Sequence, residues 1–145
     1  MRLIKTVLIG FLFTGIALLT SCKKETTIER NLWKNGGVWN IESLFVKQTS
    51  TNVSDNFNET IYNYGTFTFR KDGSGIVVIT VDGDVETEVF TYSNTKDKLT
   101  LIYGNEGRVF DMDWRKNDLT LSITDNFTSD DLSFTYSEIY RLKKK

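Results

Sequence analysis

The sequence predicts an all-β fold: an eight-stranded antiparallel meander that closes into a β-barrel, with a short N-terminal helix in front of it. Three observations lead to this prediction. The 145 residues are rich in β-branched and aromatic side chains and contain no proline, which would interrupt a strand ladder. Apolar and polar residues alternate from residue 38 onward. Short polar turns separate the alternating runs, so consecutive strands are expected to pair as hairpins.

The first 21 residues are predicted to be a lipoprotein signal peptide. Basic Arg2 and Lys5 precede an apolar run at 7–19, an order typical of secretory signals. This run is shorter than the roughly 20 residues that a membrane-spanning helix needs. Residues 19–22, Leu-Thr-Ser-Cys, place the only cysteine directly after a small residue. They resemble the lipobox of bacterial lipoproteins, which implies that Cys22 is acylated, by palmitate among other chains, and becomes the mature N-terminus.

The lipobox resemblance implies a location as well as a modification. Two or more acyl chains hold a protein firmly to a bilayer, whereas a single chain binds marginally. We therefore expect a lipid-anchored monomer in the bacterial cell envelope, at the outer membrane on its periplasmic or surface face. The net charge of −1 gives no basic footprint for nucleic acid. The expected domains are residues 1–21 as signal peptide, 22–36 as lipidated tether and short helix, and 37–145 as the β-barrel domain.

The first element after the tether is predicted to be a short helix near 27–35. Thr26 and Glu29 have the spacing of a capping box. Gly36 and Gly37 can end the helix in the left-handed conformation that glycine tolerates.

Eight runs with a period of two residues follow the helix. Turns such as Asp72-Gly73 and Asp82-Gly83 between them are typical of tight hairpins, because glycine accepts positive φ. Strands are expected at 38–46, 62–70, 75–81, 85–92, 98–103, 107–114, 118–124 and 133–142.

Strict alternation within these runs predicts which side chains face the barrel interior. The expected inward set is apolar and aromatic, and the intervening residues are mostly Thr, Ser, Asp and Arg. The inward residues are Trp39, Ile41, Phe45, Phe67, Phe69, Leu99, Leu101, Tyr103, Phe110, Met112, Trp114, Leu119, Leu121, Ile123, Phe134, Tyr136, Tyr140 and Leu142.

The barrel sequence resembles the lipocalin-like lipoproteins of Bacteroidetes. The resemblance covers residues 36–142. It rests on Gly-Val-Trp at 37–39, on the run 67–75 and on Lys-Leu-Thr-Leu at 98–101. Gly-x-Trp is the short signature of the lipocalin superfamily, and it makes Gly37 and Trp39 structural markers. The resemblance implies that the Trp lies at the closed barrel end under an Arg near the last strand, and Arg141 matches that position.

The predicted ligand site centres on Glu86 and Glu88. Both share the parity of Phe90 and Tyr92, so strict alternation turns the two carboxylates inward, where they would suit a cationic or polyhydroxyl ligand. In the alternative, a bulge before Phe90 switches the face and both glutamates lie outside. The full set of candidate ligand-binding residues is Glu86, Glu88, Phe90, Tyr92, Phe57 and Tyr103.

Two further segments are predicted to be loops. Residues 47–61 form the longest expected connection and, in lipocalin-like barrels, the corresponding loop lies over the open end. Residues 125–131 gather three carboxylates and an amide, but without the spacing of a calcium loop, so no metal site or cofactor is assigned. No catalytic residues are assigned either, because histidine is absent; we expect a protein that is not an enzyme.

Two functions remain open at this point. The first is a membrane-anchored module that binds a small hydrophobic or amphipathic ligand in or at the mouth of the barrel. The second is an envelope protein-interaction module, such as an inhibitor, an immunity-type protein or an accessory subunit, which uses loops on a filled barrel. A continuous cavity favours the first and a solid core the second.

The lipobox generates a direct test. Cys22→Ser is expected to abolish acylation, because the modification needs the thiol, and to leave the protein uncleaved or released from the membrane. Metabolic labelling with a fatty acid and membrane fractionation measure both effects. A variant that keeps its label and fractionates with membranes would contradict the lipoprotein prediction.

Overall fold

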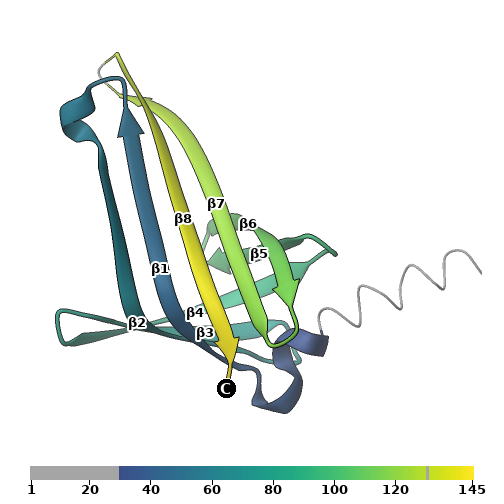
Figure 1. Ribbon diagram of the computed structural model, residues 1–145. Coiled ribbons are helices and arrows are strands. Elements are labelled where there is room, and N and C mark those ends of the chain that lie inside the picture. The colour runs from purple at the N-terminus through teal and green to yellow at the C-terminus, as the bar shows by residue number, and fades with distance from the viewer. Residues whose placement is uncertain (1–29, 130) are drawn as a thin grey trace, which may run out of the picture.

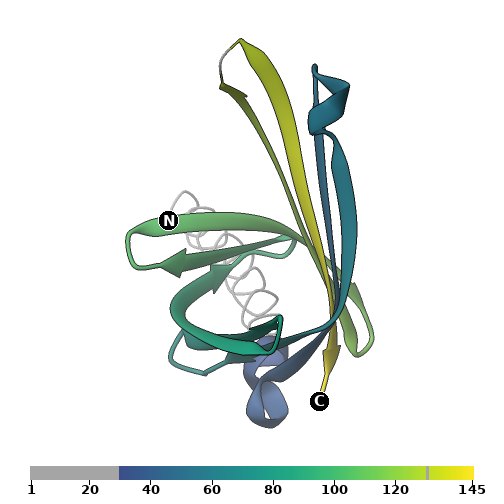
Figure 2. The same ribbon diagram turned by 90° about the vertical axis from the view of Figure 1, so that its left-hand side faces the viewer.

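The computed structural model describes residues 30–129 and 131–145, and it is an antiparallel eight-stranded barrel, as the sequence predicts (Figure 1, Figure 2). Each strand pairs with the next along the chain, and the first pairs with the last, which closes the ladder. The elements are η1 (Lys34–Gly36), β1 (Val38–Ser50), η2 (Val53–Asp55), β2 (Phe57–Phe69), β3 (Ser74–Val81), β4 (Asp84–Asn94), β5 (Lys98–Tyr103), β6 (Glu106–Arg115), β7 (Asp118–Ser129) and β8 (Leu132–Lys144).

Every strand except β5 is longer than the sequence pattern predicts, and the largest extensions are in β1, β2 and β7. The predicted long connection at 47–61 is wrong, because only residues 51–56 separate β1 from β2. The predicted loop at 125–131 is also wrong, since β7 pairs with β8 as far as Ser129. Side chains such as Asn126 and Thr128 are exposed. The alternation of apolar and polar residues is therefore lost in this segment, although β7 remains hydrogen-bonded to β8.

A β-bulge at Glu42 decides which face of β1 looks inward. The register of β1 against β8 shifts between Ile41 and Ser43 and leaves Glu42 as an extra residue. One extra residue moves all later side chains to the opposite face. Leu44 is therefore buried, and Phe45 lies on the outer face. The prediction that Phe45 points inward is wrong for this reason, and nothing in the local sequence pattern marks the bulge.

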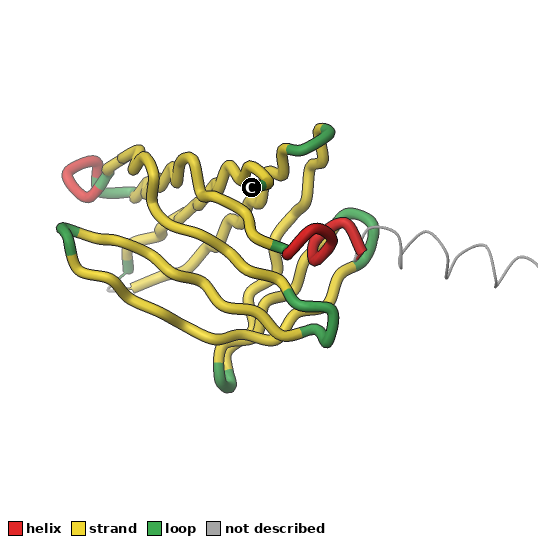
Figure 3. Tube along the Cα trace, turned by 90° about the horizontal axis from the view of Figure 1, so that it is seen from below, coloured by secondary structure: helices red, strands yellow, loops and turns green. Residues whose placement is uncertain are grey.

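The segment before β1 covers one end of the barrel, which we call the closed end. Residues 30–33 form a helical turn that continues into η1, so the predicted short helix is confirmed over the residues that the structure describes. Figure 3 shows this segment against the barrel, far from the second helical segment, η2. Leu32 is fully buried, and its carbonyl oxygen accepts a hydrogen bond of 2.8 Å from Trp39 Nε1.

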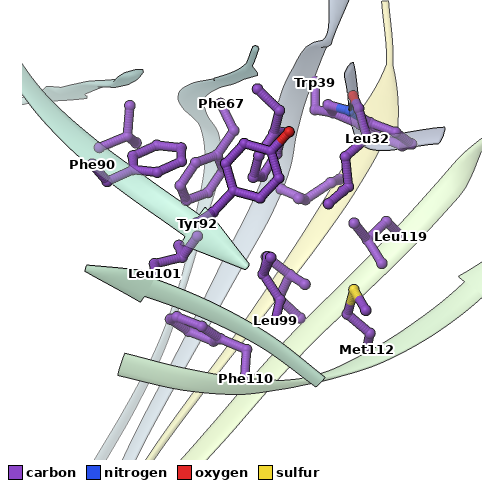
Figure 4. Close-up of a cluster of buried hydrophobic side chains, with 14 of the residues drawn as sticks. Leu32, Trp39, Phe67, Phe90, Tyr92, Leu99, Leu101, Phe110, Met112 and Leu119 are labelled. Atoms are coloured by element: carbon purple, nitrogen blue, oxygen red, sulfur yellow. Dashed lines mark hydrogen bonds between the residues drawn. The ribbon is translucent and has the colours of Figure 1, made fainter. Parts of the chain in front are cut away.

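The core fills the closed end of the barrel (Figure 4). Trp39 packs edge-on against Trp114, with ring centroids 5.5 Å apart. Figure 4 shows Leu32 beside Trp39 and the ring of Tyr92 directed toward the same cluster. Aromatic pairs in this geometry add to the stabilisation that burial supplies. The buried residues of this cluster are Leu32, Trp39, Ile41, Phe67, Phe69, Val77, Phe90, Tyr92, Leu99, Leu101, Phe110, Met112, Leu119, Leu121 and Leu142.

The opposite end of the barrel is open, because β1, β2, β7 and β8 continue as a projecting four-stranded sheet (Figure 1). β2 pairs with β3 only over 65–69, and β7 pairs with β6 only over 118–122. Figure 2 shows β3–β6 curving away from this projecting sheet. Its inner face is therefore left without a covering layer near the open end.

The turn that leads into β1 provides a matched test of the closed end. Gly36 and Gly37 both have positive φ, but a Cβ at Gly37 would collide with the backbone oxygen of Phe69, whereas nothing lies within 4 Å of one at Gly36. Either change to alanine is expected to cost about 1–2 kcal/mol in left-handed strain. Gly37→Ala is expected to cost about 1–3 kcal/mol more through the collision. Urea denaturation measures the free energy of unfolding of both variants. Equal losses in the two would contradict the predicted collision at Gly37.

Candidate functional site

A cavity of about 430 Å³ occupies the open end of the barrel. It exists because the projecting sheet and the curved β3–β6 strands diverge instead of packing face to face. Its lining comes from β1–β6 and β8. The cavity is open to solvent on one side, and the filled core of the closed end forms its floor, where Phe67 belongs to both.

The lining residues fall into two groups that come from different strands. β1, β2 and β3 supply the apolar wall, which consists of Leu44, Val46, Ile61, Phe67, Val77 and Ile79. β4, β5, β6 and β8 supply the polar wall, which consists of Glu88, Tyr103, Glu106, Arg108, Tyr136, Glu138 and Tyr140. Tyr64 from β2 also lines the cavity. The cavity therefore has one hydrophobic side and one side that forms hydrogen bonds.

A partly buried ion pair lies at the centre of the polar wall. Arg108 Nη2 lies 2.9 Å from Glu138 Oε2, and the side chains are 34% and 10% exposed. The same carboxylate oxygen accepts a hydrogen bond of 2.8 Å from the Tyr140 hydroxyl. Burial is the largest single influence on the pKa of Arg108 and lowers it, but the hydrogen bond and charge of Glu138, together with Tyr140, outweigh burial and raise that pKa. Removing either partner would leave a poorly solvated charge, which is strongly destabilising.

The tyrosines around this pair are held in the neutral form. Burial raises the pKa of Tyr103 to about 12, with Glu88 and Glu138 adding to the effect and Arg108 opposing it. Burial, followed by the charge of Glu138, also raises the pKa values of Tyr64, Tyr136 and Tyr140. At neutral pH the site therefore presents phenol O–H groups, which donate and accept hydrogen bonds, instead of phenolate charges.

Of the residues predicted for the ligand site, Glu88 and Tyr103 line the cavity. The β3–β4 register is continuous from Ser74 to Val81, so the bulge considered as an alternative before Phe90 is absent. Glu86 therefore shares the face of Glu88, but it is exposed and lies outside the cavity lining.

The other three predicted residues do not contact the cavity. Phe90 is buried in the core, where its ring centroid lies 5.7 Å from that of Tyr103. Tyr92 is also buried, and its hydroxyl donates a hydrogen bond of 2.7 Å to the Arg70 carbonyl oxygen. Phe57 begins β2 and is 45% exposed. The parity rule placed the first two inward correctly, but they lie deeper in the barrel than the cavity.

The residues predicted as structural markers lie at the closed end, with one correction. Trp39 is 1% exposed and Gly37 adopts a left-handed φ of 67°. The cation over the Trp39 ring is Lys144, whose Nζ lies 5.1 Å from the ring centroid. Arg141 is exposed on the outer face beside Phe45, because inward-facing Leu142 follows it in the strand. Cys22 lies outside the described residues.

The sequence prediction missed Arg108 and Glu138, the two charged residues that organise the polar wall. The alternation of inward and outward side chains along each strand was enough to detect both. Arg108 stands two residues before inward Phe110, and Glu138 stands between inward Tyr136 and Tyr140. An arginine and a glutamate that both interrupt an apolar face are candidates for a buried pair, since a buried charge needs a partner.

Comparisons with known proteins assign the chain to no family, so its function has to be inferred from the geometry of the cavity. No model of a known protein family matches the chain, and no curated protein is found to match it. Over residues 30–129 and 131–145, no helix has the length and hydropathy that crossing a membrane would require. Within the same ranges, no three acidic, His or Cys side chains come together as a metal site.

The raised pKa of Tyr103 predicts a loss of stability in alkali. The folded state holds this phenol proton up to about pH 12, whereas the unfolded chain releases it near pH 10. The folded state then binds more protons, so the free energy of unfolding falls as pH rises through this window. Tyr103→Phe should make the fall shallower, as measured by urea denaturation at a series of pH values.

Trp114→Phe is the matched control for this prediction. It shrinks an aromatic side chain that packs against Trp39 at the closed end and does not line the cavity, and it removes no titratable group. It should lower stability similarly at each pH and leave the slope unchanged. A Tyr103→Phe variant with the wild-type slope would show that the phenol is not held neutral by its surroundings.

Proposed function

We propose that this protein is a lipid-anchored module of the bacterial cell envelope that binds a small amphipathic molecule in the open end of its barrel. The observation that carries the proposal is the cavity between the apolar and polar walls. Its volume of about 430 Å³ falls in the range of about 300–1,000 Å³ typical of small-molecule sites. A molecule with an apolar and a polar side satisfies both walls at once, whereas water alone leaves the apolar wall hydrated.

Binding, and not catalysis, is the role that the polar wall supports. Glu138 is the most deeply buried carboxylate in the cavity, and its oxygen already accepts hydrogen bonds from Arg108 and Tyr140. A carboxylate engaged in this way is poorly placed to accept a proton from a substrate. The neutral tyrosines offer hydrogen bonds and ring faces, which orient a ligand without reacting with it.

The anchoring part of the proposal rests on the lipobox at Cys22 and not on the described residues. The competing interaction module depended on a long first loop and a filled barrel. The loop consists only of residues 51–56, and the open end contains a cavity. Both observations favour the ligand-binding function.

A cavity-filling substitution with a matched control tests the proposal. Ile79 lines the cavity, whereas its neighbour Val78 does not. Ile79→Trp is expected to prevent ligand retention, and Val78→Trp on the opposite face of β3 is expected to preserve it. Denaturing extraction of each purified protein, followed by mass spectrometry, detects the retained molecule. The proposal fails if the wild-type protein releases none and no amphipathic compound raises its melting temperature.

A further inference from the structure

The charges that line the cavity do not balance, and this narrows the class of ligand. Three carboxylates, Glu88, Glu106 and Glu138, face the cavity with one guanidinium, that of Arg108. The Arg108–Glu138 pair neutralises itself at 2.9 Å. Two negative charges therefore remain at the polar wall without a matching cation.

Glu88 and Glu106 are the carboxylates that remain. They come from the starting halves of β4 and β6, and both are exposed at the rim of the cavity. Among the described residues, no basic side chain lies within ion-pairing distance of either one. A positively charged group at the rim would meet two carboxylates that have no competing partner in the part of the chain that the structure describes.

The rings below the rim are also suited to a cation. Tyr64, Tyr103, Tyr136 and Tyr140 line the same cavity. A neutral aromatic ring attracts a cation over its face, and clusters of such rings bind quaternary ammonium groups. The ring of Tyr140 is held by edge-on contacts with Phe67 and Phe110, at centroid distances of 6.0 and 5.9 Å. This ring is therefore already fixed in position before a ligand binds.

An anionic ligand would meet the opposite conditions. It would be repelled at the rim by Glu88 and Glu106. The only cation in the lining as described is Arg108, and its charge is already balanced by Glu138 at 2.9 Å. An anion that took the place of Glu138 would leave a carboxylate buried without a partner, which is unfavourable.

We propose that the ligand is an amphipathic cation, with an apolar part against the apolar wall and a positively charged group between Glu88, Glu106 and the tyrosine rings. This inference rests on the proposed function and specifies its ligand class. Charge at the rim selects the cation, and the apolar wall supplies affinity that does not depend on charge. The two contributions are therefore separable by experiment.

Three probes that share a six-carbon tail separate them: hexyltrimethylammonium, hexyl glucoside and heptanoate. Calorimetric titration of the purified full-length protein is expected to show the tightest binding for hexyltrimethylammonium and the weakest for heptanoate. Glu88→Gln and Glu106→Gln should each weaken hexyltrimethylammonium binding by about threefold to fivefold, as expected for one partly exposed charge pair. Neither should change hexyl glucoside binding. Asp84→Asn, the same change of charge at the exposed start of β4, is the control and should change none of the three affinities.

The other outcomes distinguish this inference from the proposed function. Equal or tighter binding of heptanoate or of hexyl glucoside would overturn the cation class and leave the binding function intact. Equal loss of hexyltrimethylammonium affinity in Glu88→Gln and Asp84→Asn would show that affinity depends on the total charge of the protein and not on recognition at the rim. This result would also overturn the cation class. If none of the three probes binds, both the proposed function and the ligand class fail together.

Discussion

The pairing of β1 with β8 is the interaction on which the rest of this structure depends. It extends from Trp39 opposite Lys144 to Ser50 opposite Phe134. Every other strand pair is a hairpin with a short connection, whereas this pair joins the two ends of the domain and closes the longest loop. The same contact closes the ladder at one end of the barrel and forms the centre of the projecting sheet at the other.

The two ends of the barrel use the same strands for different purposes. An eight-stranded barrel is wide enough to be filled by side chains or to hold one small ligand. At the closed end large side chains such as Trp39 and Phe69 fill the interior, and both are 1% exposed. At the open end the bulge at Glu42 turns Leu44 toward the cavity and Phe45 away from it. A single extra residue in β1 thus decides that this strand contributes aliphatic Leu44 to the apolar wall and not the ring of Phe45.

The architecture was predictable from the sequence because the period-two pattern and the hairpin turns are local signals. The strand order and barrel closure follow from eight such units in a meander. The outer ends of β1, β2, β7 and β8 were not predictable in this way, because segments such as 125–129 are exposed and alternation carries no information there. The bulge was hidden for another reason: Glu42 is compatible with regular alternation, and only the partner strand shows that it is extra.

The site was predictable in part, and its central pair shows where the limit lies. Parity placed Glu88 and Tyr103 on the correct face, and the same rule, applied to charged residues, would have included Arg108 and Glu138. Parity does not show that these two meet across the barrel, because β6 and β8 are not neighbours in the ladder; both pair with β7. The contact between Arg108 and Glu138 requires both side chains to lie at the same height along the barrel axis. That height is set by the stagger of all the strands, which the sequence pattern does not show.

The Arg108–Glu138 pair is better explained by the proposed ligand site than by the stability of the fold. A buried ion pair can often be replaced by well-packed apolar residues without loss of stability, and the closed end of this barrel is filled in that way, apart from hydroxyls such as that of Tyr92. In the cavity the pair performs a task that apolar residues cannot, because Glu138 accepts the hydrogen bond from Tyr140 and so orients that phenol. Glu138 also balances the charge of Arg108 at 2.9 Å. The pair therefore contributes no net charge to the described lining, and the net charge of the open end is left to Glu88 and Glu106 at the rim.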